Sequence, residues 1–96
     1  MSYFVYIMTN ANETVLYTGV TNNLERRVHQ HRTGEGSAFT KRHQVKKLVF
    51  YERFDSINDA IAAEKRTKAG SRANKIKLIE EQNPAWNDLA DKLALL

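Results

Sequence analysis

The first twenty residues constrain the fold most, because two runs typical of β-strands are separated by a polar turn. YFVYIM (3–8) is rich in aromatic and β-branched residues and predicts one strand, and VLYTGV (15–20) predicts a second. The segment between them, TNANET (9–14), is polar and typical of a turn. The sequence therefore predicts a β-hairpin over residues 3–20.

The remainder predicts one further strand and several helices. Asn22 or Asn23 is a candidate N-cap for a helix that ends near residue 31 or 32, where TGEGS (33–37) stops it with two glycines. KKLVFYERF (46–54) predicts the third strand. Ser56, with Asp59 three residues later, resembles a capping box at the start of the next helix.

Three helices are expected after the third strand. The first runs to about residue 69, where Gly70 ends it, and SRANKIKLIEEQ (71–82) predicts the second. AWNDLADKLALL (85–96) predicts a terminal amphipathic helix with Trp86, Leu89 and Leu93 at helical spacing. We expect one domain, residues 1–96, of the α+β class: a three-stranded antiparallel sheet flanked by helices.

Composition limits the classes of function. The 96 residues contain no cysteine, which excludes disulfides and thiolate metal sites, and the N-terminus lacks the basic region of a signal peptide. No apolar run approaches membrane-spanning length, so we expect a cytoplasmic protein with no membrane partner. The net charge of +4 is uneven, because residues 1–78 carry 14 basic against 7 acidic side chains. A polyanionic partner would explain this basic body, as would an ordinary solvated surface.

Polar residues that fall on or beside the apolar stripes of two predicted helices are candidate functional residues. His31 lies on the apolar face of the first helix, at i+7 from Leu24, and Arg27 flanks that face. On the helix after the third strand, Glu64 continues the spacing of Ile57, Ala60 and Ile61. Buried charges need partners, so Arg27 and Glu64 either pair with each other, lie at the rim of the core, or belong to a site. His31 is either a hydrogen-bonded helix histidine or part of that site.

Two tyrosines in the hairpin admit similar alternatives. Tyr6 and Tyr17 each occupy the alternating face of a predicted strand, so they either form an aromatic cross-strand pair or line a site. Gly19 marks a bulge or a close approach of a packed helix or a ligand phosphate. Tyrosine and histidine can transfer protons, arginine can bind phosphate through two hydrogen bonds, and one carboxylate can hold Mg²⁺ together with water and substrate oxygens. This combination suits phosphodiester chemistry.

The run TKRHQVKK (40–47) is a basic patch beside the glycine loop. It is either a solvated loop or a surface for a nucleic-acid backbone. The three histidines do not form a recognisable zinc motif, and the sequence has no phosphate-binding glycine loop of the Walker type. The candidate nucleic-acid-binding residues are Gly19, Arg27, Lys41, Arg42, Lys46 and Lys47.

The order of these residues resembles the GIY-YIG nuclease family. FVY (4–6) and YTG (17–19), separated by ten residues, correspond to the two signature triplets through Tyr6, Tyr17 and Gly19. The helix NNLERRVHQH supplies the arginine and histidine that follow in the family, and a glutamate comes from the later helix. The length of the chain, and sequence segments over residues 3–82, resemble the small stand-alone bacterial branch of this family. The candidate catalytic residues are Tyr6, Tyr17, Arg27, His31 and Glu64.

The resemblance implies a metal-dependent DNA endonuclease that hydrolyses phosphodiesters on branched, nicked or damaged DNA, with a role in repair or recombination. It implies that Glu64 holds a single Mg²⁺ or Mn²⁺, that Tyr17 or Tyr6 helps to deprotonate water, and that Arg27 steadies the phosphate. His31 would assist proton transfer. A free tyrosine has a pKa near 10, so either tyrosine would need help from a cation or metal-bound water.

Two other classes of function are compatible with the sequence. One is a nucleic-acid-binding module without catalysis, which the basic body favours and which predicts binding that weakens steeply with salt. The other is an adaptor that meets a protein partner through the acidic C-terminal helix, although packing of that helix on the core explains the same pattern.

Overall fold

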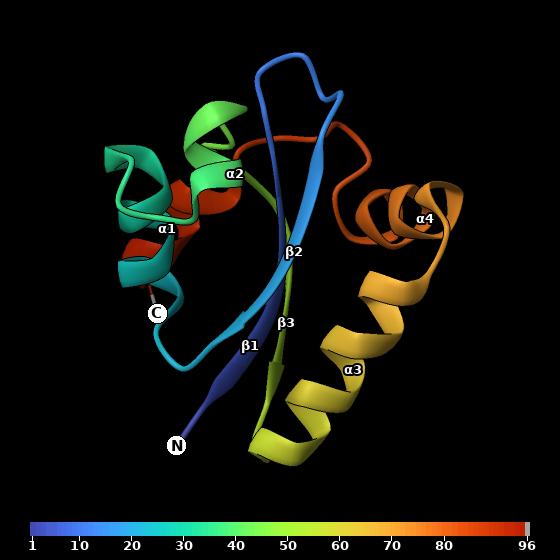
Figure 1. The fold of residues 1–96 in the computed structure, drawn as a ribbon. Coiled ribbons are helices and arrows are strands. Elements are labelled where there is room, and N and C mark those ends of the chain that lie inside the picture. The colour runs from blue at the N-terminus through green and yellow to red at the C-terminus, as the bar shows by residue number, and fades with distance from the viewer. Residues whose placement is uncertain (96) are drawn as a thin grey trace.

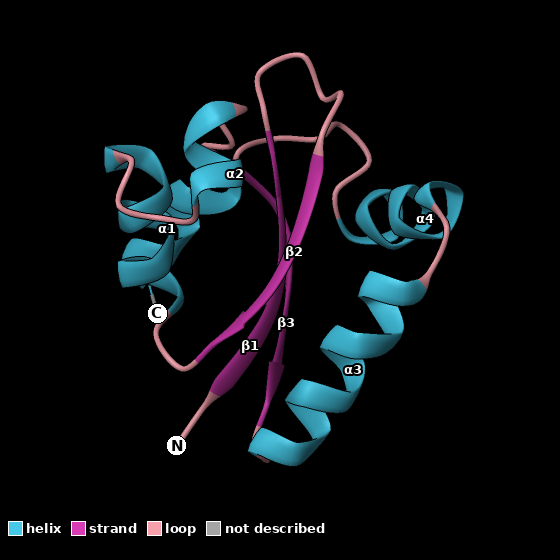
Figure 2. Cartoon of the chain, viewed as in Figure 1, coloured by secondary structure: helices cyan, strands magenta, loops and turns pink. Residues whose placement is uncertain are grey.

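A computed structural model describes residues 1–95, with the side chains of residues 94 and 95 excepted. A three-stranded sheet forms the middle layer, and helices cover both of its faces (Figure 1). Helices α1 (Leu24–Thr33) and α2 (Ala38–Arg42) lie on one side, and α3 (Ile57–Ala69) and α4 (Arg72–Gln82) lie on the other (Figure 2). The predicted α+β class and flanked antiparallel sheet are confirmed.

The sheet has the order β2-β1-β3, with both pairs antiparallel. Its strands are β1 (Tyr3–Thr9), β2 (Leu16–Thr21) and β3 (Lys47–Phe54), each within one residue of the predicted bounds. The β1–β2 turn is fixed by Asn10, whose Oδ1 accepts hydrogen bonds from the backbone N–H groups of Thr14 and Val15. This topology leaves β2 as one edge strand, between the helical layers.

Local capping explains where the helices begin. The side chains of Asn23, Ser56 and Ser71 accept backbone hydrogen bonds at the N-termini of α1, α3 and α4. Gly34 follows α1 with φ at 82°, a left-handed conformation that glycine adopts without steric cost. These short-range signals lie in the sequence, which is why the helix boundaries were predictable.

One helix was missed. The segment from 34 to 46 was expected to be a glycine loop followed by a basic loop, but residues 38–42 form α2. Ser37 caps it by accepting a hydrogen bond from the backbone N–H of Thr40, and Thr40 is buried beneath it. The helix has only five residues and no apolar stripe, so periodicity could not reveal it.

The prediction for the C-terminus was partly wrong. A 3₁₀ helix, η1, begins only at Leu89 and runs to Leu95, and Trp86 precedes it with a positive φ of 54°. Leu89 and Leu93 are buried against the β1 side chains Tyr6 and Met8, whereas Trp86 packs with the cluster on the opposite face of the sheet. Leu89, Leu93 and Trp86 are therefore used in packing on the sheet.

The second face of the sheet also differs from the predicted helical stripe. Ala60 and Ala63 are the residues of α3 that pack on Val5, while Ile57 and Ile61 are 50% and 36% exposed. The apolar spacing of Ile57 and Ile61 therefore marked an exposed face. Glu64 lies at the border between this exposed face of α3 and the buried face, and its side chain is 15% exposed.

The free edge of β3 is closed by side chains that follow it in sequence. Gln82 both accepts from the backbone N–H of Tyr51 and donates to its carbonyl. Asp88 accepts from the backbone N–H of Leu48 and also pairs with Arg32 at 2.6 Å. These bonds occupy backbone groups that an edge strand otherwise leaves open to association.

Candidate active site at the β2 edge

Tyr6 forms the floor of the candidate site. Its side chain is fully buried in the core beneath α1, and its hydroxyl lies 3.2 Å from Nε2 of His31. Burial raises the pKa of Tyr6 to about 12, against the opposing effect of the nearby Arg27 guanidinium. Tyr6 therefore keeps its proton at neutral pH and serves as a hydrogen-bonding group.

The cross-strand partner of Tyr6 is Gly19, and this pairing explains the glycine. A Cβ atom at position 19 would lie 2.4 Å from the Tyr6 hydroxyl oxygen and 2.5 Å from Cζ. The close approach expected at Gly19 is therefore made by the Tyr6 ring. Tyr17 pairs with Met8 instead, so the two tyrosines are diagonal neighbours, with ring centroids 6.4 Å apart.

His31 comes from the last turn of α1 and is 2% exposed. Burial, followed by the charge of Arg27, lowers its pKa below the usual value, so the ring is neutral near pH 7. Its Nε2 faces Tyr6, and Nδ1 has no hydrogen-bond partner among the described residues. Gly36 leaves room there, because a Cβ atom at that position would lie 3.2 Å from Nδ1. A neutral histidine in this position can accept a proton.

Tyr17 is the tyrosine that reaches the surface. Its ring is half-buried, and it contacts the His31 ring on one side at a centroid distance of 5.3 Å. On another side it stacks with Phe39 of α2, with ring centroids 6.3 Å apart and an interplanar angle of 29°. Of the two tyrosines, Tyr17 is therefore the one that is partly exposed, whereas Tyr6 is fully buried.

Arg27 and Glu64 place opposite charges near the tyrosines. Arg27, one turn before His31 on α1, is half-buried and lowers the pKa of both His31 and Tyr6. Glu64 reaches from α3 on the other face of the sheet, and its charge contributes to raising the pKa of Tyr6. Arg27 and Glu64 do not form an ion pair with each other in the described structure. Glu64 instead pairs with Lys68 at 3.5 Å.

The basic residues divide into two groups. Lys41 and Arg42 on α2, and Lys46 after it, are exposed. Lys47 forms an ion pair with Glu13 at 2.7 Å, which makes the Lys47 ammonium less available to bind phosphate. Helix α2 therefore carries exposed cations beside Tyr17, on the residues expected to form a loop.

The donor set suits a hard divalent cation. Within the described residues, no group of three or more histidine, cysteine, aspartate or glutamate side chains could hold a metal ion. The carboxylate whose charge acts on Tyr6 is that of Glu64. Mg²⁺ commonly keeps several waters and binds through one or two carboxylates together with substrate phosphate. The Glu64 side chain is largely buried and makes a 3.5 Å contact to Lys68, which is consistent with that mode of binding.

Comparison with known proteins decides the family. Residues 2–77 match the GIY-YIG catalytic domain. The chain belongs to the GIY-YIG family. Relatives include a UPF0213 protein of Natronomonas pharaonis, 44% identical over 80 residues that cover 83% of this chain and 93% of that protein. A UPF0213 protein of Pediococcus pentosaceus is 34% identical over 87 residues, which cover 91% and 90% of the two chains.

A solved structure supports the same GIY-YIG assignment. The solution NMR structure of a UPF0213 protein from Bacillus halodurans aligns with a TM-score of 0.59 and 28% identity, covering 92% of this chain and 93% of that one. The resemblance drawn from the ordered motifs is thus confirmed, and the chain carries a nuclease-type catalytic domain. None of the described helices is long and apolar enough to cross a membrane.

Two residues beside the GIY-YIG tyrosines escaped sequence reasoning. Phe39 was hidden in a segment expected to be a loop, although a large aromatic residue between a cap and a basic run was a signal. Gly36 was interpreted only as a helix stop. Its contact with His31 depends on how the chain returns after α1, which no local pattern encodes.

Proposed function

We propose that the chain is a metal-dependent DNA endonuclease that hydrolyses phosphodiesters at the β2 edge, on branched, nicked or damaged DNA in repair or recombination. The observation that carries the proposal is the convergence of Tyr17, His31 and Arg27 around Tyr6, with Glu64 approaching from the opposite face. These groups match the types that phosphodiester hydrolysis requires: a proton acceptor, a phosphate ligand and a metal ligand.

The two tyrosines take different roles. In the proposed reaction, the oxygen of the partly exposed Tyr17 takes the proton of the attacking water while its own hydroxyl proton passes to the neutral imidazole of His31. The ring centroids of Tyr17 and His31 lie 5.3 Å apart, and the neutral imidazole of His31 helps to order and transfer that proton. Tyr6 keeps its own proton, since burial raises its pKa to about 12, and it holds His31 through the 3.2 Å hydrogen bond. Tyr6 is therefore a positioning residue.

Charge at the site is divided between Arg27 and Glu64. The Arg27 guanidinium binds the scissile phosphate and compensates the charge that develops on its oxygens. Glu64 would hold Mg²⁺ or Mn²⁺, and a bound cation would polarise the phosphate and offset the negative charge that develops on its oxygens. The exposed Lys41, Arg42 and Lys46 contact the neighbouring DNA backbone.

The tyrosine assignment is tested by cleavage of labelled nicked, branched and duplex DNA with Mg²⁺. Removing a general acid or base typically slows a reaction by about 10²- to 10⁴-fold, so we expect Tyr17→Phe to do so. Tyr6→Phe should slow cleavage by less than about 10-fold, because it loses one hydrogen bond of about 1 kcal/mol. Equal losses in the two variants would refute the division of roles. Absence of metal-dependent product from the native protein on every substrate would refute the endonuclease.

A further inference from the structure

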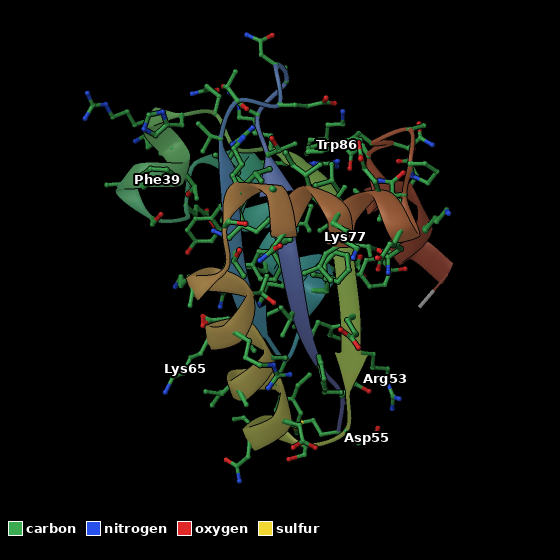
Figure 3. The ribbon with its side chains drawn as sticks, turned by 90° about the vertical axis from the view of Figure 1, so that its right-hand side faces the viewer. Phe39, Arg53, Asp55, Lys65, Lys77 and Trp86 are labelled. Carbon is green, nitrogen blue, oxygen red and sulfur yellow. The ribbon has the colours of Figure 1, made fainter. Side chains whose placement is uncertain are left out.

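Phe39 continues the aromatic residues of the proposed site outward to solvent. The row begins with the buried Tyr6, passes through Tyr17 and reaches Phe39, whose ring also contacts that of His43 at a tilted angle, with ring centroids 4.5 Å apart. Phe39 is 47% exposed, although it is the largest apolar residue of α2. Figure 3 shows it at the outer margin of the molecule, far from Trp86. A single exposed apolar side chain is ordinary, but one that stacks on a proposed reacting residue requires a reason.

The surroundings of Phe39 favour a polyanion with flat rings. Arg42 and His43 follow Phe39 at i+3 and i+4, so they lie on the same side of α2 as its ring. Lys41 is on another side, over Gly34. An aromatic ring beside an exposed guanidinium is the combination that binds nucleotides, because the ring stacks on a base while the cation contacts the adjacent phosphate.

We propose that Phe39 is a stacking residue for an unpaired DNA base next to the scissile phosphate, with Arg42 binding the phosphate of the same nucleotide. In duplex DNA the faces of the bases are covered by their neighbours, so an exposed ring gains a partner only where a base is unpaired or extruded. The proposed endonuclease would therefore select gapped or branched DNA, in which an unpaired base offers an open face. This inference rests on the proposed function for the identity of the substrate.

Binding is measured without divalent metal, in EDTA, so that the result does not depend on cleavage. The probes are a single-stranded oligonucleotide, a gapped duplex with one unpaired base, and a fully paired duplex of the same sequence. Phe39→Ala should weaken binding to the first two by about 5- to 150-fold, the range expected for one base–aromatic stack. Binding to the paired duplex should change little.

Conservative variants separate stacking from packing. Phe39→Tyr and Phe39→Trp should retain the preference for unpaired DNA, whereas Phe39→Leu, which keeps apolar volume against Tyr17 but has no flat ring, should lose it. Arg42→Ala should reduce the slope of log K against log[salt] by about 1, and the Phe39 variants should leave that slope unchanged. Thermal unfolding of each variant confirms that it is folded.

A fluorescence experiment reports the stack itself. In a Trp86→Phe background, Phe39→Trp supplies the single tryptophan, and unpaired DNA should quench it. Ile57→Trp in the same background is the matched control, because Ile57 is 50% exposed but lies on α3. The inference is overturned if Phe39→Leu binds unpaired DNA as tightly as the native protein, or if all three DNA probes are affected equally. An inactive protein that still shows selective quenching would refute the endonuclease and leave the stacking residue established.

Discussion

The substitution Gly19→Ala tests the packing on which the site is built. The added Cβ atom would lie 2.4 Å from the Tyr6 hydroxyl oxygen, 2.5 Å from Cζ and 2.8 Å from Cε1, where ordinary contacts begin at 3.4 Å. The ring must therefore move by about 1 Å. Tyr6 is fully buried among Met8, Leu24 and Val28, so it cannot move without disturbing the core and its bond to His31.

The expected cost follows from three contributions. Overpacking a well-packed core costs about 1–3 kcal/mol. Weakening the Tyr6–His31 hydrogen bond adds about 1 kcal/mol. Replacing glycine by alanine within a strand returns about 0.5–1 kcal/mol, because the unfolded chain has less freedom to lose. We expect a net loss of about 1–3.5 kcal/mol and a fall in Tm of about 4–28 °C for a domain of this size.

Urea unfolding followed by circular dichroism measures this loss, with Gly70→Ala as the matched control. Gly70 has an ordinary φ of −69°, and a Cβ there would lie 3.3 Å from the carbonyl oxygen of Thr67, so its change should stay within about 1 kcal/mol. In a Tyr6→Leu background the three clashing atoms are absent, and the penalty of Gly19→Ala should largely vanish. A loss no greater than that of Gly70→Ala, or one that persists with Leu at position 6, would refute the packing argument.

Two further outcomes concern the surroundings of the site. Because the pKa of His31 is lowered in the folded chain, the unfolded chain binds a proton that the folded one does not, so the free energy of unfolding should decrease as pH falls below about 6.5. His31→Gln should flatten this dependence in urea titrations and the exposed His29→Gln should not; an unchanged slope in His31→Gln would contradict the assignment. Asp88→Ala should lower the free energy of unfolding by about 1–2 kcal/mol, because it removes the acceptor for the Leu48 backbone N–H. Arg32→Ala breaks the exposed ion pair and should lower it by less than about 1 kcal/mol. Equal costs in urea unfolding would show that the backbone bond contributes nothing.

The parts of the fold that follow from short-range patterns were predictable. Runs rich in aromatic and β-branched residues predicted the strands. Asn22 or Asn23 and Ser56 predicted two helix starts, and the side chains of Asn23 and Ser56 do accept backbone hydrogen bonds from N–H groups three residues ahead. The family followed from the order of the five candidate catalytic residues. Those residues were found from motif spacing and element type, before any distance was known.

The remaining parts depend on tertiary contacts. The exposure of Ile57 and the burial of Ala63 reverse what hydrophobicity alone predicts, because a small residue lets α3 approach the sheet closely. The role of Gly19 required the β1–β2 register, which places it opposite Tyr6. The positions of Phe39 and Trp86 depend on a five-residue helix and on a backbone turn with positive φ, and neither leaves a periodic signal.

The central claim is that Glu64 supplies the metal ligand of a DNA-cleaving site at the β2 edge. It is tested most directly by DNA cleavage with Mg²⁺, Mn²⁺ or EDTA, comparing the native protein with Glu64→Ala and with Asp59→Ala, an exposed acid on the same helix. We expect metal-dependent product from the native protein and from Asp59→Ala, and none from Glu64→Ala, which should still bind DNA in EDTA. Cleavage by Glu64→Ala at the native rate would contradict it.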